Sequence, residues 1–151
     1  MPTFTVIKPR AEEVEGQPIL RPLPSAKCRS VGPFVFFDHM LLTYYPPGHG
    51  MNIQQHPHIG LSTLTYLFEG HLQHKDSLGS DQLVGPGEVS WMTAGAAIAH
   101  IERTPAPLRA GRAAGVVHQH ARQASSEQGI DHGCQVQALA QTAGALAGVS
   151  L

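Results

Sequence analysis

The sequence is short of charge, of cysteine and of long apolar runs. Charged residues make up 14% of the 151 residues, where about 25% is usual, and the formal net charge is −1. This balance argues against the basic surface that direct nucleic-acid binding or a polybasic membrane contact needs. Two cysteines, Cys28 and Cys134, are too few for a disulfide framework or a Cys-rich zinc site. No apolar stretch is long enough to span a bilayer. We therefore expect a cytoplasmic protein with no membrane contact.

Histidine is the residue in surplus, with ten in a chain that has so few charges. Two His-x-His pairs occur, His56 with His58 in "QQHPHIG" and His118 with His120 in "GVVHQHARQ". Either pair has the spacing of metal ligands. The plain alternative is that such a pair lies on the surface or in the core without binding anything.

The part of the chain up to about Thr104 has the pattern of an all-β domain. Runs rich in β-branched and aromatic residues, such as "PFVFFDHMLLTYY" and "LSTLTYLFEG", are broken by Gly, Pro, Asn and Asp, which predicts short strands in an antiparallel β-sandwich or barrel. Glycine-containing hairpin turns are expected at 69–70, 78–79 and 85–87. Residues 105–151 contain no Phe, Tyr, Trp or Lys, so we expect an irregular or weakly helical tail, with its helix around Gln135–Leu146.

A metal site is predicted where His56 and His58 meet a second pair, His100 and Glu102. Alternate side chains of a strand share a face, so each i, i+2 pair projects to one side, and Pro57 places its segment at an edge. If the two strands lie side by side, three imidazoles and one carboxylate converge. A divalent metal held this way keeps one or two positions open for water or substrate.

Three segments, "GPFVFFDHM", "HPHIGLSTLTYLFEGHLQHKDSLGS" and "LVGPGEVSWMTAGAAIAHIER", resemble the N-terminal cupin domain of the pirin family. The resemblance covers about residues 3–104. It implies a cupin double-stranded β-helix over residues 1–104 that carries one metal, with ligands at His56, His58, His100 and Glu102. The expected metal is iron, although this donor set also accepts Mn, Co, Ni, Cu or Zn. One departure is Ser62, where pirins typically carry a glutamate, and it changes the polarity around the metal.

The resemblance implies an oxidoreductase, a metal-dependent dioxygenase of the quercetin 2,3-dioxygenase type that opens a flavonol ring with O₂. Glu102 is then the catalytic residue that accepts the proton of the flavonol 3-hydroxyl. One alternative is a non-enzymatic iron-binding protein that senses redox state and acts through a protein partner. Another is an inactive, truncated pirin.

Several further residues have a structural interpretation at this stage. Trp91 and Phe68 are expected in the core or lining a cavity, and His74 is expected at a solvated strand position after a turn. Asp38 and His39 either orient a ligand imidazole or satisfy a turn.

Residues 105–151 do not resemble the family, and the second cupin domain of pirins is absent from the chain. A back-translation of Ala114–Gln123, read one base further on, gives "QVWFINTPAK", close to the pirin segment expected here. We hypothesise a frameshift between about Glu102 and Ala114, so that His118, His120 and His132 form no metal site. The alternative is a genuine divergent tail. A lone cupin domain would also expose apolar surface, which favours dimerisation.

Overall fold

The computed structural model describes residues 6–105, 111–113, 116–122 and 136–140, the last three ranges for their backbone only. Strands are the only regular secondary structure among these residues, which confirms the all-β prediction. The strands are β1 Arg10–Val14, β2 Gln17–Leu23, β3 Phe34–Met40, β4 Thr43–Tyr45, β5 Asn52–His58, β6 Leu61–Leu67, β7 Leu72–Asp76, β8 Asp81–Val84, β9 Glu88–Thr93, β10 Ile98–Arg103, β11 Gly111–Ala113, β12 Val116–Arg122 and β13 Val136–Ala140. A search of the described part of the chain found no helix with the length and apolarity of a membrane span.

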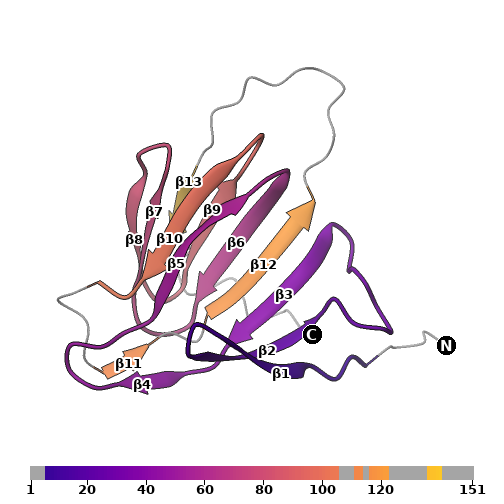
Figure 1. Ribbon diagram of the computed structural model, residues 1–151, viewed down its shortest axis with the longest axis horizontal. Coiled ribbons are helices and arrows are strands. Elements are labelled where there is room, and N and C mark those ends of the chain that lie inside the picture. Colours follow the sequence, from indigo (N-terminus) through magenta and orange to yellow (C-terminus); the bar gives the residue numbers. More distant parts are fainter. Residues whose placement is uncertain (1–5, 106–110, 114–115, 123–135, 141–151) are drawn as a thin grey trace.

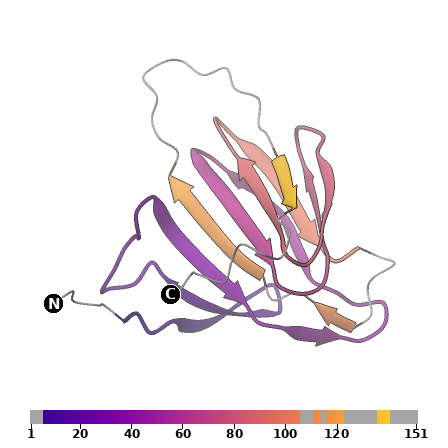
Figure 2. The same cartoon turned by 180° about the vertical axis from the view of Figure 1, so that it is seen from behind.

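The strands build two large antiparallel sheets. One has the order β1-β2-β3-β12-β6-β9-β13, and the other has the order β5-β10-β7-β8. The two sheets lie face to face as a sandwich, while β4 and β11 form a small pair at one end (Figures 1 and 2). Strands β5 and β10, which carry the two predicted ligand pairs, are neighbours in the smaller sheet.

The core lies between the inner faces of the two sheets, where alternate residues of each strand point inward. In β10 every second residue is buried, starting with Ile98, as the period of two in a strand requires. One buried apolar cluster joins residues of both sheets, namely Ile19, Met40, Met51, Ile53, Leu67, Leu72 and Val84. Burying each such side chain stabilises the fold by about 1.5–3 kcal/mol, so this layer holds the sheets together.

Glycine occupies the turns that the sequence predicts. Gly70, Gly79 and Gly87 have φ values of 80°, 96° and 79°, a region that disfavours side chains with a Cβ. The turn at 78–79 closes the β7–β8 hairpin. The turns at 69–70 and 85–87 were expected to close hairpins too, and both expectations were wrong. Each turn carries the chain from one sheet to the other, because β6 and β9 belong to the larger sheet and β7 and β8 to the smaller one.

Two further expectations need correction. Within the predicted helix at Gln135–Leu146, the backbone of Val136–Ala140 is strand β13, paired with the edge of β9; residues 141–146 lie outside the described residues. The open edge of β9 offers backbone partners that outweigh a weak helix propensity. Trp91 is 40% exposed, because the flanking residues Ser90 and Met92 take the inward positions of β9. Phe68 is 52% exposed and follows the buried Leu67 at the end of β6.

Candidate metal centre

Strands β5 and β10 bring the two predicted pairs together. They pair antiparallel, with His100 opposite His56 and Ile98 opposite His58, so the expectation that these strands lie side by side is confirmed. The register then shifts by one residue. Glu102 lies opposite Ile53, whereas an unbroken register would place it opposite Gln54. This bulge adds a residue to β5, and bulges of this kind re-aim side chains next to functional sites.

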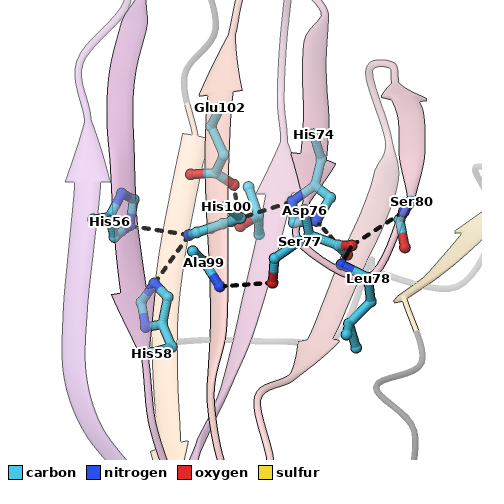
Figure 3. Close-up of polar contacts among 11 residues, drawn as sticks. His56, His58, His74, Asp76, Ser77, Leu78, Ser80, Ala99, His100 and Glu102 are labelled. Carbon is cyan, nitrogen blue, oxygen red and sulfur yellow. Dashed lines mark hydrogen bonds and ion pairs between the residues drawn. The ribbon is translucent and has the colours of Figure 1, made fainter.

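Three imidazole nitrogens meet at one point. The Nε2 atom of His100 lies 2.9 Å from Nε2 of His58 and 3.0 Å from Nε2 of His56, as Figure 3 shows. Two nitrogens bound at right angles to one ion, each at about 2.1 Å, lie about 3.0 Å apart. The two distances from His100 therefore fit neighbouring ligands of a single transition-metal ion.

The hydrogen bonds of His56 suit this role. Its Nδ1 lies 2.8 Å from the carbonyl oxygen of Gln54, and a carbonyl can only accept, so Nδ1 carries the proton. In the neutral ring Nε2 then holds a lone pair. A ligand histidine is usually oriented in this manner, with its second nitrogen donating to a backbone carbonyl or a carboxylate.

Glu102 is buried beside the histidines, with 3% of its surface exposed. Thr65 Oγ1 donates a hydrogen bond to its Oε1 at 3.4 Å. Burial raises the pKa of the Glu102 carboxyl above its ordinary value, and the nearby His74 and His56, with the Thr65 hydrogen bond, act in the opposite direction. The net effect favours a carboxyl that holds a proton more tightly than usual when no cation is next to it.

Two overlapping groups could hold a metal among the described residues. The first is His56, His58 and His100, and the second is His74, His100 and Glu102; within each group the ligand atoms lie within 4.8 Å of one another. His100 is common to both. The structure thus brings His56 and His58 to His100. It also places Glu102 beside His100, together with His74, which was not predicted as a ligand. The four predicted ligands as one set remain a prediction.

His74 is that additional histidine, and the expectation of a solvated position was wrong. It is 1% exposed, and it lies opposite Glu102 in the β7–β10 pair. A signal was present in the sequence. Leu72 is apolar and points inward, so the residue two positions later on the same strand shares its buried face.

A pocket opens next to His56 and Glu102. Its apolar wall consists of Val14, Phe36, Met40 and Ile53. This wall suits contact with a flat, mostly apolar part of a ligand.

Arg21 and Asp38 form the polar wall of the same pocket. Nε and Nη2 of Arg21 donate to the two carboxylate oxygens of Asp38, both at 2.7 Å, and the guanidinium lies 4.5 Å from the centre of the Phe36 ring. The hydrogen bond with Asp38 is the main cause that raises the pKa of Arg21. Asp38 thus pairs with an arginine, rather than orienting an imidazole or satisfying a turn. His39 lies near the Phe68 ring, 6.0 Å between centroids.

The remaining site predictions concern Ser62 and the second His-x-His pair. Ser62 is buried on β6, and its hydroxyl lies 3.3 Å from Thr93 Oγ1. The backbone of β12 places His118 and His120 between β3 and β6. Their side chains, like all of His132 and Cys134, lie outside the described residues, so the absence of a site there stays a prediction.

The face-to-face antiparallel sheets, with a histidine cluster between them, define a cupin fold. A solved quercetin 2,3-dioxygenase from Acinetobacter baumannii has the same fold, with a TM-score of 0.79 and 34% identity; the match covers 88% of this chain and 43% of that one. The family model described as Pirin matches residues 16–136. The chain belongs to the pirin family.

Curated relatives agree with this assignment. A pirin-like protein of Caulobacter vibrioides is 48% identical over 100 residues, which are 65% of this chain and 35% of that protein. A protein of Pseudomonas aeruginosa that carries the name "Putative quercetin 2,3-dioxygenase" is 43% identical over 96 residues, 63% of this chain and 30% of its own length. The chain thus spans about a third of the length of these relatives. The family match continues beyond residue 104, and a domain boundary at that residue remains a prediction.

Proposed function

We propose that this chain holds one transition metal, iron in the cell, on His56, His58, His100 and Glu102, and acts as a dioxygenase of the quercetin 2,3-dioxygenase type. The observation that carries the proposal is the meeting of three imidazole Nε2 atoms within 3.0 Å contacts beside a buried carboxylate that lines an open pocket. Imidazole and carboxylate are the donors that non-haem iron prefers. When bound, such a metal supplies a Lewis-acid and redox centre for an electron-rich substrate and O₂.

The residues of the pocket fit a flavonol. The side chains of Phe36, Met40 and Ile53 form an apolar surface against which a planar aromatic ring can pack. We propose that Glu102 accepts the proton of the flavonol 3-hydroxyl. It lines the pocket beside His56, and a general base must lie within hydrogen-bond reach of the proton that it accepts.

The names of relatives support this choice of substrate. The solved structure from Acinetobacter baumannii carries the name quercetin 2,3-dioxygenase, and the Pseudomonas aeruginosa relative carries the name "Putative quercetin 2,3-dioxygenase". The matched segments cover only 43% and 30% of those proteins. The activity is therefore proposed for this chain on the strength of its own pocket and histidines.

The test is an aerobic assay of the purified chain loaded with Fe²⁺, with quercetin loss, O₂ uptake and release of carbon monoxide measured together. We expect turnover in the wild type, loss of bound iron and of turnover in His56→Ala, and a rate at least about 100-fold lower in Glu102→Gln. His49→Ala is the control, because this exposed histidine lies outside the cluster. An iron-loaded wild type that takes up no O₂ with quercetin would refute the proposed reaction, and one that binds no iron would refute the metal site.

A further inference from the structure

His100 is bonded at both ends of its ring. Its Nε2 meets His56 and His58, and its Nδ1 lies 3.3 Å from Nδ1 of His74. On the far side, His74 Nε2 lies 3.3 Å from Oδ2 of Asp76. Figure 3 shows the resulting line from Asp76 through His74 to His100. Both histidines are 1% exposed and the Asp76 side chain is fully buried, so water does not compete for these contacts.

The chemistry of the groups gives the line a direction. An ionised carboxylate only accepts, so Nε2 of His74 donates to Asp76. In a neutral imidazole the other nitrogen then holds a lone pair, so Nδ1 of His74 accepts a hydrogen bond from the Nδ1–H group of His100. His100 therefore carries its proton on Nδ1 and has a lone pair on Nε2. That lone pair points at the place where His56 and His58 also converge.

Asp76 is held rigidly at the start of this line. Its Oδ1 accepts hydrogen bonds from the backbone amides of Leu78 at 2.9 Å and Ser80 at 3.1 Å. The next residue, Ser77, is bonded twice to Ala99, from its own amide to the Ala99 carbonyl at 2.8 Å and from the Ala99 amide to its hydroxyl at 3.2 Å. The β7–β8 turn is thus fixed to β10 directly beside His100.

We propose that Asp76 and His74 are positioning residues: they fix the ring orientation and the Nδ1–H tautomer of His100, so that its Nε2 is presented to the metal. This inference rests on the proposed metal site. It assigns a role to two residues that bind neither metal nor substrate. Partners of this kind typically contribute about 10–100-fold in metal affinity.

The competing arrangement is a metal on His74, His100 and Glu102. It would require a lone pair on Nδ1 of His100 and hence the proton on its Nε2. That proton would donate a hydrogen bond to Nε2 of His56 or His58, at 3.0 and 2.9 Å. The Asp76 contact leaves a lone pair on Nδ1 of His74 in both arrangements. We assign the metal to Nε2 of His100 because two further imidazole nitrogens lie there, and the Gln54 contact of His56 leaves a lone pair on one of them.

The first test reads the tautomer directly. Long-range ¹H–¹⁵N NMR of the full chain, without added metal and with Zn²⁺, reports which nitrogen of His100 carries the proton. We expect the proton on Nδ1 in both states. A proton on Nε2 without metal, or Zn²⁺ bound at Nδ1, overturns the proposal.

The second test measures Co²⁺ affinity and the visible spectrum of bound Co²⁺. We expect His74→Phe, which removes both contacts, to bind Co²⁺ about 10–100-fold more weakly. His74→Asn places an acceptor oxygen where Nδ1 was and should recover most of that loss. His71→Asn, a histidine that precedes β7 outside the cluster, should bind as the wild type does.

The outcomes separate the two proposals. A wild type that binds no Co²⁺ refutes the metal site, and the positioning role falls with it. A wild type that binds Co²⁺, with His74→Phe equal to it in affinity and spectrum, refutes the positioning role alone. If His74→Phe loses Co²⁺ as completely as His56→Ala, and His74→Asn does not recover it, His74 is a ligand and the proposal is wrong. Thermal unfolding of each variant shows that it is folded.

Discussion

His100 and His56 face each other across the β5–β10 pair, with their Nε2 atoms 3.0 Å apart although 44 positions separate them in the chain. Without a cation, two or three imidazoles at this spacing compete for the same space with their lone pairs. A bound cation relieves this repulsion, because each lone pair then coordinates the cation.

Metal binding should stabilise the folded chain. Because the site is assembled only when β5 and β10 pair, a metal at 100 times its dissociation constant adds about 2.7 kcal/mol to the free energy of unfolding. The midpoint of thermal unfolding should rise by about 5–10 °C with added Ni²⁺ or Co²⁺ and fall back with EDTA. His58→Ala should abolish the increase, and His49→Ala should keep it. An equal increase in His58→Ala would show that the metal binds elsewhere.

Asp76 should contribute stability that depends on pH. Burial by itself would raise its pKa, but hydrogen bonds from Ser80, His74 and Leu78 lower the pKa below its usual range. A group with a lowered folded pKa stabilises the protein above its unfolded pKa, and this contribution is lost as the pH falls through the folded value. We expect Asp76→Asn to cost about 1–2 kcal/mol at pH 7, and the difference from the wild type to shrink below about pH 4.

Urea unfolding of metal-free wild type and Asp76→Asn at several pH values measures this difference. Glu13→Gln is the control, since that carboxylate is exposed on β1. A cost for Asp76→Asn that stays constant down to pH 3 would contradict the linkage.

Replacing Arg21 should lower the free energy of unfolding much more than replacing Arg10, which lies opposite it in the β1–β2 pair. Arg21→Met leaves Asp38, which is 4% exposed, as a buried carboxylate without its bidentate partner, and breaking such a pair costs about 3 kcal/mol. Arg10 pairs with Glu12 on the exposed side of β1, so Arg10→Met should change stability by less than about 1 kcal/mol. Chemical denaturation of both variants checks this order. Similar costs for the two would mean that the Arg21–Asp38 pair adds nothing to the fold.

Gly50 should not tolerate alanine. A Cβ at this position would lie 2.8 Å from Cβ of Thr104, where the chain leading into β5 is bonded to the end of β10 through the Met51 carbonyl. Overpacking of this kind costs about 1–3 kcal/mol, and it would shift β5 relative to β10, so metal affinity should fall with stability. Gly85→Ala is the matched control, because its nearest new contact would be an ordinary 3.5 Å. A Gly50→Ala chain with wild-type stability would contradict the close approach.

The sequence by itself determined the strand character and the faces of the ligand pairs. Both depend on the period of two along a strand, which is a local rule. His56 with His58, and His100 with Glu102, could therefore be recognised as pairs, and glycine marked the turns because few other residues adopt a positive φ. The resemblance to pirins then indicated the fold in which such pairs meet.

Only the tertiary structure decided which groups touch. The bulge in β5, the burial of His74 and the pairing of Asp38 with Arg21, 17 positions away, all depend on which strands become neighbours and in what register. Trp91 was placed in the core because it is large and apolar, yet the alternation of β9 turns it outward. The period of a strand does not say which of its two faces will be covered, because that is decided by the sheet that packs against it.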